Sequence, residues 1–494
     1  MKSLAKKVFY DPTKARVFYD FFAVLIISIS CFLIFAIFKN EYAKPIEYTY
    51  APLVVALNYL LGLYTHKKIS SLILKLEILV TSSLGAFAII SILTSTFSPV
   101  LFLLSIFSIV LLFLPRVFLN FHILSYGNVP LQTVIKAHSP ILVVGGGGYI
   151  GSHVVEKLLS KGYSVKVFDK FLYGRSVLKD LEQNPKLEVI EGDITNIFEL
   201  TLALQNTQAV IHLAGIVGDP ASALDPAVTR HMNITSTRIL KDNAKAFKIP
   251  RFIFASSCSV YGFADDLVSE KSPTNPLSLY AQSKIDSENE ILRETADFFH
   301  PTVLRFATVF GHSRRPRFDL VANLFTAKGF FKEDITVFNS DQWRPLIHTK
   351  DIANAIVMTL EAPIEKVSRQ IFNVGDDRMN YTISEIASMA QEIASKDHKI
   401  LVHHKDFAED KRNYKVSFEK INRVLHFQSS VDLREGMEEM YSNFAKKVYK
   451  KHYSDSIYSN LEMTKFIKSE FYSEKYKKSH VTDFDLTNPS YATS

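Results

Sequence analysis

A glycine-rich run directly after a short apolar segment restricts the fold more than any other feature of the chain. Pro140 to Val144 predicts a buried strand, and the run GGGGYIGSHVVEKLLSKG follows it. The run holds glycines at both G-x-x-G-x-x-G and G-x-G-x-x-G spacing: Gly145, Gly146, Gly148 and Gly151. Such glycines allow a tight turn whose backbone approaches a pyrophosphate, and the helix expected from about Tyr149 turns its positive end toward that group. The run therefore predicts a dinucleotide-binding turn.

The sequence around the glycines supplies the context that a bare glycine pattern lacks. The amphipathic helix after the turn is followed by a second strand, SVKVFD, which ends at Asp169. This carboxylate lies about 18 residues past Gly151, where it can accept hydrogen bonds from the adenosine ribose of a dinucleotide. Because an anion at this position would repel a 2′-phosphate, we expect NAD rather than NADP.

Strands and helices continue to alternate along the chain. Further strands are expected at LEVIEGD, AVIHLAG, RFIFASS and TVLRF, with helices between them at 197–204, 226–246 and 279–296. This alternation predicts an α/β fold with a doubly wound parallel Rossmann sheet, in which ligands bind at the carboxyl ends of the strands. The expected cofactor-binding residues are Gly145, Gly148, Tyr149, Ile150, Gly151, Asp169, Asp193, Ile194, Leu213, Ala214, Gly215, Tyr280 and Lys284.

Ser257, Tyr280 and Lys284 form the candidate proton-transfer site. Tyr280 and Lys284 are one helical turn apart, so their side chains share a helix face. A free tyrosine has a pKa of about 10, which is too high for a base at neutral pH. A cation about 4 Å away contributes roughly 4 kcal/mol at an effective dielectric constant of about 20, which corresponds to about three pKa units. We therefore expect Lys284, helped by the positive nicotinamide ring, to bring the pKa of Tyr280 into working range. A Y-x-x-x-K pattern alone often marks a solvated helix face, but here it follows the glycine turn and the strand end at Ser257.

From Ile141 to about Met440 the chain resembles the extended short-chain dehydrogenase/reductases, and among them the NAD-dependent sugar-nucleotide epimerase/dehydratase family. The matching stretches are GGGGYIGSH, GDI at Gly192, HLAG at His212, ASSCSVYG at Ala255, SLYAQSK at Ser278, WRPLIHTKDIA at Trp343 and FNVG at Phe372. The resemblance implies that Tyr280 is the base, that Lys284 also holds the nicotinamide ribose and that Ser257 polarises a sugar hydroxyl. It also implies a smaller C-terminal subdomain, mainly after about residue 305, that binds the sugar nucleotide.

The resemblance further implies three residues for the substrate diphosphate, namely Asn323, Arg344 and Arg412. The two arginines suit this role because a guanidinium binds phosphate bidentately, and the alternative for each is a surface ion pair. The 4,6-dehydratases of the family carry Asp-Glu after the catalytic hydroxyl residue, where this chain has Cys258 and Ser259. Neither replaces a carboxylic acid at neutral pH, so dehydration is disfavoured and Cys258 is expected to be a small packing residue.

Four apolar stretches precede the enzyme segment, at about 17–38, 48–64, 70–93 and 99–114. A helix needs roughly 20 apolar residues to cross a bilayer, so we expect residues 1–130 to form an all-α anchor of four transmembrane helices. The second and third stretches could instead be buried soluble helices, which would leave two spans. Positive charges flank the first span and fill the second loop, so the positive-inside rule places the enzyme domain in the cytoplasm. GLYTHKK and LPRVFLN also resemble membrane regions of polysaccharide-biosynthesis enzymes.

The overall composition bears on nucleic-acid binding, disulfide and metal sites, and the order of the C-terminal residues. The net charge of +7 over 494 residues is modest and the basic residues are scattered, so we expect no nucleic-acid binding. The two cysteines, Cys31 and Cys258, fit a reducing compartment and suggest no disulfide framework, and no metal site is expected. Residues 450–494 are rich in Tyr, Lys and Ser, which predicts a poorly ordered polar tail.

These features together predict a multi-pass inner-membrane protein with three parts: an anchor at 1–130, an NAD-binding enzyme domain at 139–440 and the tail. The expected activity is epimerisation of a nucleoside-diphosphate sugar, at C4, for surface polysaccharide assembly, by a homodimer formed through the enzyme domain. A 4-ketosugar reductase or dehydratase of the same family is the enzymatic alternative. A non-catalytic NAD-binding scaffold that recruits glycosyltransferases is the alternative from another class.

Overall fold

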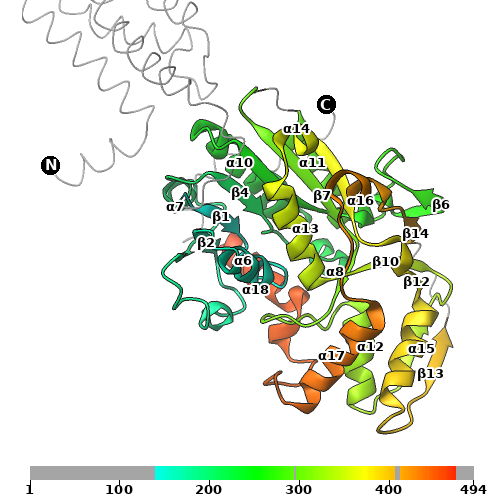
Figure 1. Cartoon of the computed structure of the whole chain (residues 1–494). Helices are drawn as coiled ribbons and strands as arrows, with labels where there is room; N and C mark the ends of the chain where they lie inside the picture. Colours follow the sequence, from blue (N-terminus) through cyan, green and yellow to red (C-terminus); the bar gives the residue numbers. More distant parts are fainter. Residues whose placement is uncertain (1–138, 294–295, 406–411, 474–494) are drawn as a thin grey trace, which may run out of the picture. The chain divides into compact units, whose positions relative to one another are not determined.

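The computed structural model describes residues 139–293, 296–405 and 412–473 (Figure 1). The expected membrane anchor at 1–130 and the end of the expected tail, 474–494, lie outside these ranges. Within the described residues, no helix has both the length and the apolar character that crossing a bilayer requires.

A seven-stranded sheet forms the centre of the fold, in the order β11-β7-β5-β4-β1-β2-β3. Every pairing in this sheet is parallel. Its strands are β1 (Ile141–Val144), β2 (Val165–Asp169), β3 (Leu187–Glu191), β4 (Ala209–His212), β5 (Arg251–Ser257), β7 (His300–Phe306) and β11 (Gln370–Val374). The strand segments predicted from the alternation are confirmed, and β11 is an additional strand at the edge. The sheet is thus the doubly wound parallel arrangement expected from the sequence.

Successive residues of β1 are buried against opposite layers of helices. Its first and third residues belong to an apolar cluster that includes α6 (Gly151–Ser160) and α13 (Thr349–Glu361). Its second and fourth residues belong to a cluster that includes α7 (Ile197–Ala203), α10 (Ser236–Ala246) and α11 (Leu279–Leu292). Because side chains alternate across a strand, an entirely apolar strand such as this one requires cover on both faces. Figure 1 shows helices on either side of the sheet.

A smaller subdomain follows β7 and has its own apolar core. Its elements are β8 (Thr308–Phe310), α12 (Val321–Phe330), β9 (Ile335–Phe338), β10 (Trp343–His348), β12 (Asn380–Thr382), α15 (Ile383–Ala394), β13 (Val402–Lys405) and α17 (Leu433–Ala445). One further sheet pairs β14 (Asn413–Val416) with β6 (Phe263–Val268), a strand that precedes α11. The subdomain expected mainly after residue 305 is therefore present, with one strand contributed from earlier in the chain.

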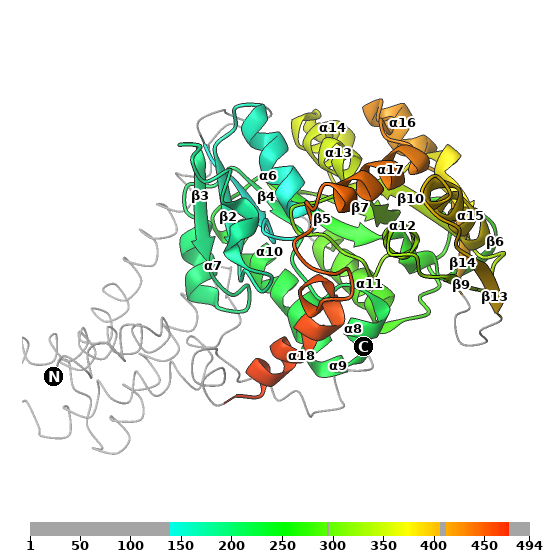
Figure 2. The same cartoon turned by 90° about the horizontal axis from the view of Figure 1, so that it is seen from below.

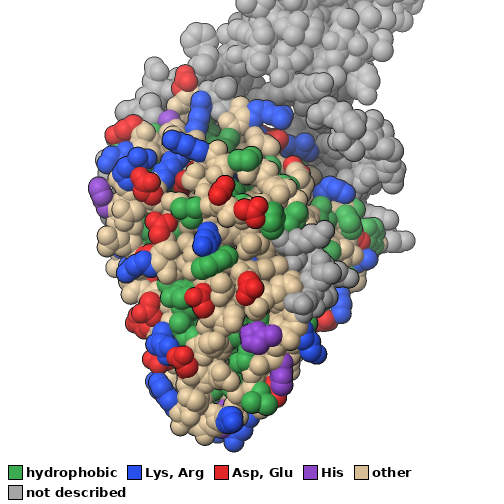
Figure 3. All heavy atoms as spheres, turned by 90° about the vertical axis from the view of Figure 1, so that its right-hand side faces the viewer, with side chains coloured by type: hydrophobic (Ala, Val, Ile, Leu, Met, Phe, Trp, Pro, Cys, Tyr) green, Lys and Arg blue, Asp and Glu red, His purple; other side chains and the backbone are tan. Residues whose placement is uncertain are grey.

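Short helical segments connect these elements. They are η3 (Arg175–Leu178), α8 (Asp219–Ala223), α9 (Pro226–Arg230), the π-helix η4 (His231–Thr235), η5 (Cys258–Tyr261), α14 (Ile364–Val367), η6 (Asp377–Met379), α16 (Glu419–Leu425) and η7 (Ser456–Tyr458). The single helix expected over 226–246 is built from α9, η4 and α10 in succession. Figure 3 shows one face of the molecule, where acidic and basic side chains of the described residues are interspersed rather than gathered by sign.

The structure differs from the expected polar tail at α18 (Asn460–Phe471). This helix lies beside α8 and α9 (Figure 2). Ser459 caps it by accepting a hydrogen bond from the backbone N–H of Glu462. Ile467 and Phe471 are only 8% and 9% exposed, and they join the apolar cluster of α10 and α11. The expectation of poor order is therefore wrong for this helix, because two apolar residues one turn apart anchor an otherwise polar segment.

Replacement of Ile467 by Ala tests whether α18 is part of the folded domain. We expect Ile467→Ala to lower the free energy of unfolding by about 2 kcal/mol, because it removes buried methyl groups and leaves a void. The matched control is Phe466→Ala on the same helix, where the ring is 54% exposed. That control should change stability by about 0.5 kcal/mol or less. Equal effects of the two substitutions in urea denaturation would contradict the docking of α18.

Candidate active site

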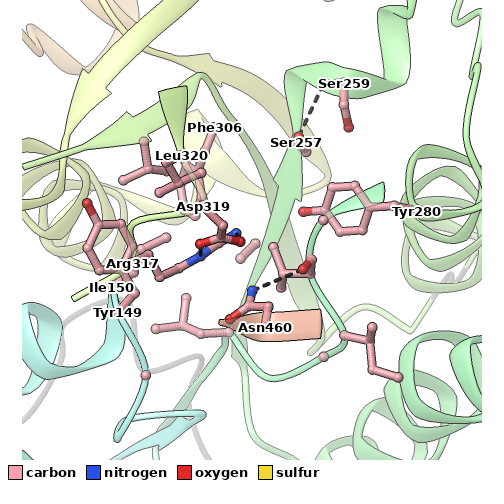
Figure 4. A pocket seen from close by; sticks show the side chains of 18 of the residues that line it. Tyr149, Ile150, Ser257, Ser259, Tyr280, Phe306, Arg317, Asp319, Leu320 and Asn460 are labelled. Carbon is pink, nitrogen blue, oxygen red and sulfur yellow. Dashed lines mark hydrogen bonds and ion pairs between the residues drawn. The ribbon is translucent and has the colours of Figure 1, made fainter. Parts of the chain in front are cut away.

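A cavity of about 650 Å³ opens at the carboxyl ends of the central strands (Figure 4). Its walls are formed by the turns after β1 to β5, by α11, by parts of the smaller subdomain and by α18. A cavity of this size accommodates a nucleotide-sized ligand. All the site residues expected from the sequence line this cavity, with the single exception of Asn323.

The glycine turn after β1 leaves no space for side chains. A Cβ on Gly151 would lie 2.2 Å from the carbonyl oxygen of Gly145. Gly145 has a φ of +88°, and a Cβ there would lie 2.6 Å from the backbone nitrogen of Ala214. Helix α6 begins at Gly151 and its N-terminus has no side-chain cap. The uncapped end of α6 therefore faces the cavity as a site for a phosphate group.

Asp169 connects the end of β2 to the glycine turn. Its carboxylate accepts a hydrogen bond of 2.8 Å from the backbone N–H of Gly147 and one of 2.7 Å from that of Phe171. Burial raises the pKa of Asp169, and these backbone donors oppose the increase. Asp169 lines the cavity, so its position matches the expected contact with the adenosine ribose.

The three candidate catalytic residues meet where β5 ends and α11 begins. Ser257 is the last residue of β5, and its hydroxyl is close enough to that of Tyr280 to oppose the increase that burial causes in the Tyr280 pKa. Figure 4 shows both side chains on the same side of the cavity, with Ser257 bonded to Ser259. The ammonium group of Lys284 donates to the carbonyl oxygen of Ala255 at 2.8 Å and lies 5.7 Å from the centre of the Tyr280 ring. The structure thus assembles the predicted Ser257, Tyr280 and Lys284 in one corner of the cavity.

The electrostatics of this corner bear on the expectation that Lys284 lowers the pKa of Tyr280. Burial raises the pKa of Tyr280, and the largest opposing effect comes from the charge of Arg317. Burial also lowers the pKa of Lys284 to about 8, and Glu288 opposes this decrease. Lys284 is itself desolvated and bound to a carbonyl group, and a pKa of about 8 leaves it mainly protonated at pH 7. The expected lowering of the Tyr280 pKa by Lys284 together with the positive nicotinamide ring concerns the NAD-bound enzyme, and it stays a prediction.

A buried ion pair holds α11 against the sheet below the catalytic residues. The guanidinium of Arg305 on β7 donates to both carboxylate oxygens of Glu288, with a shortest distance of 2.7 Å. Ser256, next to Ser257, donates to the same carboxylate. Glu288 follows Lys284 by one helical turn, so this pair fixes the rotation of α11 about its axis.

Asn233 is a positioning residue that the sequence analysis did not identify. It lies in the π-helix η4, and its amide oxygen accepts a hydrogen bond of 2.7 Å from the backbone N–H of Ile216. Its amide nitrogen donates to the hydroxyl of Ser283 at 3.0 Å. Asn233 thus connects the turn after β4 to α11, next to Lys284. A single asparagine in the run HMNIT carries no pattern that could have revealed this role.

Two arginines of the cavity also escaped the sequence analysis. Arg317 forms a 2.7 Å ion pair with Asp319, and both lie between Tyr149 and Tyr280 in Figure 4. The guanidinium of Arg315 lies 3.5 Å from the centre of the Tyr173 ring. The run HSRRPRFD directly after a strand end was the available signal, because basic residues at such an edge indicate an anionic ligand.

Arg315 has fewer partners than a buried cation requires. Its Nη2 donates to Asn460 at 2.7 Å, whereas its Nε has no hydrogen-bond partner among the described residues. Burial lowers the pKa of Arg315 to about 10. A buried charge with an unused donor is costly unless a ligand completes it. Arg315 therefore indicates that an anionic group binds in this part of the cavity.

The structure corrects the expectation that Asn323 binds the substrate diphosphate. Asn323 is fully buried, and its amide oxygen accepts a hydrogen bond of 2.9 Å from the backbone N–H of Gly311. Its amide nitrogen donates to the hydroxyl of Tyr149 and to the carbonyl oxygen of Arg317. These hydrogen bonds occupy the amide of Asn323 and hold the glycine turn against α12. Asn323 therefore stabilises the site without lining the cavity.

Arg344 and Arg412 line the cavity as expected. Arg344 Nη1 donates to the carbonyl oxygen of Arg412 at 2.7 Å. Arg412 forms an ion pair with Asp219, a residue that also accepts a hydrogen bond from Ser278 at the start of α11. The two arginines are therefore neighbours, and they stand on the side of the cavity formed by the smaller subdomain.

The positions after Ser257 hold no carboxylic acid. Cys258 is buried, its thiol donates to the carbonyl oxygen of Arg305 at 3.3 Å, and burial raises its pKa. This is the packing role expected for Cys258. Ser259 lines the cavity and its backbone N–H donates to the hydroxyl of Ser257 at 3.1 Å. Ser259 therefore orients Ser257 rather than supplying an acid.

Residues 141–375 match the profile of the family described as the NAD dependent epimerase/dehydratase family. This segment of the chain is similar to the proteins of that family. The seven-stranded sheet, the glycine turn and the corner of Ser257, Tyr280 and Lys284 all lie within the matched residues or at their edge. The protein is therefore an enzyme of the epimerase/dehydratase type.

Proteins of this family with similar sequences and structures are known. A UDP-glucose 4-epimerase of Lactobacillus helveticus is 27% identical over 276 residues, which are 52% of this chain and 82% of that enzyme. The structure of a UDP-glucose 4-epimerase of Thermotoga maritima with UDP-glucose has a TM-score of 0.57 and 26% identity, covering 63% of this chain and 99% of that one. A UDP-glucuronic acid 4-epimerase of Bacillus cereus, with UDP-glucuronic acid and NAD, has a TM-score of 0.57 and 27% identity, covering 63% and 100%.

The described residues fit NAD as the cofactor of this enzyme. The glycine turn and the uncapped α6 suit a pyrophosphate, and Asp169 suits a ribose. Arg315 offers an unused donor beside the same cavity. NAD, when bound, supplies hydride transfer, while the chain provides the phosphate and ribose contacts and the proton-transfer groups.

Replacement of Lys284 by Met should stabilise the ligand-free protein at pH 7, by up to about 3 kcal/mol. The reason is that burial lowers the pKa of Lys284 to about 8 from 10.5, so the folded protein disfavours its charge. Between about pH 8 and pH 10.5, the unfolded chain binds more protons at Lys284 than the folded one does. Wild-type stability therefore rises with pH in this window, and the advantage of Lys284→Met shrinks.

Urea denaturation at pH 7 and pH 10 measures this effect. The control is Lys271→Met, an exposed lysine outside the cavity, which should show no such pH-dependent difference. If Lys284→Met were less stable than the wild type at pH 7, the desolvated state of Lys284 would be refuted.

Proposed function

We propose that the protein is an NAD-dependent epimerase of nucleoside-diphosphate sugars that inverts the hydroxyl group at C4. The observation that carries this proposal is the corner of Ser257, Tyr280 and Lys284 on a nucleotide-sized cavity, next to positions 258 and 259 that lack a carboxylic acid. The names of the similar enzymes, which are 4-epimerases of UDP-glucose and UDP-glucuronic acid, support the choice of reaction and of substrate class.

In the proposed reaction, Tyr280 takes the proton from the sugar 4-hydroxyl while Ser257 hydrogen-bonds the same oxygen. NAD held at the glycine turn and Asp169 would supply a reversible hydride acceptor for C4. The flat 4-keto sugar presents its other face, and Tyr280 then gives the proton back, so that neither proton nor hydride is consumed. Arg317 favours the ionised Tyr280 that this step requires, since its charge opposes the effect of burial.

The charge of the cavity supports a diphosphate-bearing substrate. Arg344 and Arg412 lie together on the wall formed by the smaller subdomain. A guanidinium binds phosphate oxygens through paired N–H donors. A sugar nucleotide bound there would direct its sugar toward Tyr280 while the dinucleotide occupies the glycine turn.

Purified protein should interconvert one pair of 4-epimers when it is given UDP-, GDP- or CDP-hexoses without added reductant. Tyr280→Phe should lower kcat by about 10²- to 10⁴-fold, because it removes the proton-transfer group. The matched control is Tyr163→Phe, whose hydroxyl bonds Glu361 at the surface and which lies outside the cavity. Chromatography of the nucleotide sugars measures both.

Three outcomes would replace the proposal. A strict need for stoichiometric NADH or NADPH would identify a 4-ketosugar reductase. A 4-keto-6-deoxy product would identify a dehydratase. Unchanged cellular glycans in a strain that carries Tyr280→Phe would favour a scaffold that recruits glycosyltransferases.

We propose in addition that residues 1–130 anchor the enzyme at the cytoplasmic face of the inner membrane, where it serves surface polysaccharide assembly. The support comes from the sequence, which holds an apolar run of span length at about 17–38 with positive charges before it. A cytoplasmic enzyme domain has access to nucleotide sugars and to NAD.

Full-length protein should remain in the membrane pellet after an alkaline carbonate wash. Protease added to spheroplasts should leave the enzyme domain intact, whereas protease added to inverted vesicles should digest it, because only the inverted vesicles expose the cytoplasmic face. Release by carbonate would contradict anchoring, and digestion in spheroplasts would contradict the orientation.

A further inference from the structure

A three-residue ion-pair cluster lies at the ribose end of the cofactor cavity. The ammonium of Lys170 lies 2.8 Å from the carboxylate of Asp193, and it also pairs with the carboxylate of Glu470 on α18. Lys170 directly follows Asp169, and Lys170 and Asp193 both line the cavity. The side chains of Lys170 and Asp193 are 23% and 12% exposed, so these two groups are partly shielded from bulk water, whereas that of Glu470 is 37% exposed.

Helix α18 belongs to the wall of this cavity. Asn460, Thr464 and Ile467, on successive turns, line it. Asn460 accepts hydrogen bonds from the hydroxyl of Tyr173 at 2.9 Å and from Arg315 at 2.7 Å. The helix lies far beyond the family-matched residues 141–375, so its contribution is separate from the features that define the family. Glu470, near the end of α18, is thereby held at the position where it reaches Lys170.

A cation beside the carboxylate at the end of β2 is the feature that lets such a site accept a 2′-phosphate. Lys170 is such a cation. Its burial favours the neutral amine, but Asp193 and Glu470 outweigh that effect and raise its pKa. Lys170 is therefore charged at neutral pH, and its charge is already matched by two carboxylates. An added 2′-phosphate would meet the carboxylates of Asp169 and Asp193, which line the cavity, and a Lys170 ammonium whose charge Asp193 and Glu470 already match.

We propose that Glu470, through its ion pair with Lys170, makes the cofactor site select NAD over NADP. Glu470 acts by holding Lys170 and matching its charge, so that this ammonium does not bind the extra phosphate. The proposal rests on NAD as the cofactor and is independent of which sugar the enzyme converts. A failure of the epimerase assay would therefore leave it standing.

Glu470→Gln tests the proposal in the nucleotide-free full-length protein. Calorimetric titration with NAD and with NADP gives the two dissociation constants, and the shift of Tm on ligand addition gives a second reading. We expect the preference for NAD to fall by about tenfold, because Lys170 becomes available to the 2′-phosphate. NAD binding itself should change little, since the 2′-hydroxyl contact of Asp169 is retained.

Two further variants make the outcome decisive. Glu462→Gln removes a carboxylate from the same helix that pairs only locally, with Lys465, and it should leave the preference unchanged. In the Lys170→Gln background, Glu470→Gln should no longer raise NADP affinity, because the cation it frees is gone. An unchanged preference in Glu470→Gln would overturn the proposal. An equal gain in both backgrounds would also overturn it, since Glu470 would then act without Lys170.

Discussion

The catalytic corner depends on the buried ion pair between Glu288 and Arg305. Glu288 is 3% exposed and Arg305 is 5% exposed. Removal of either residue would therefore leave a buried, uncompensated charge on the other. Breaking such a pair typically costs about 3–5 kcal/mol, more than most single contacts contribute. Because Glu288 lies one turn from Lys284 and two from Tyr280, the pair sets which face of α11 turns toward the cavity. Ser256 bonds the same carboxylate, so β5 and its terminal Ser257 are fixed by the same group.

Much of this arrangement could be predicted because it depends on patterns among residues that are close in sequence. Alternating apolar strands and amphipathic helices predicted the parallel sheet, and a glycine turn with a carboxylate at the next strand end predicted the cofactor wall. In each case the physical requirement acts within a short stretch of sequence. At Gly151, for example, a Cβ would collide with the carbonyl oxygen of Gly145, six residues earlier. The order of Ser257, Tyr280 and Lys284 in the sequence then predicted that the catalytic residues lie at the carboxyl ends of the strands.

The parts that escaped prediction depend on contacts between distant residues. Arg315 and Asn460 are far apart in the chain, and the role of each in the cavity depends on the hydrogen bond that joins them in the fold. Asn323 matched the family pattern for a phosphate ligand, but Gly311 and Tyr149 consume its amide. The spacing of Tyr280 and Lys284 likewise contains no information about how deeply both are buried, although burial raises the pKa of Tyr280 and lowers that of Lys284.

The position of α18 has a consequence for how the enzyme is assembled during synthesis. The sheet and the catalytic corner are complete once the ribosome has passed β11 and the smaller subdomain, but the cofactor cavity still lacks Asn460, Thr464 and Ile467. The cavity that a dinucleotide would occupy is thus completed by one of the last segments of the enzyme domain to be synthesised. A ligand that contacts α18 in this cavity would stabilise the docked helix by mass action, so ligand binding and the docking of α18 are coupled.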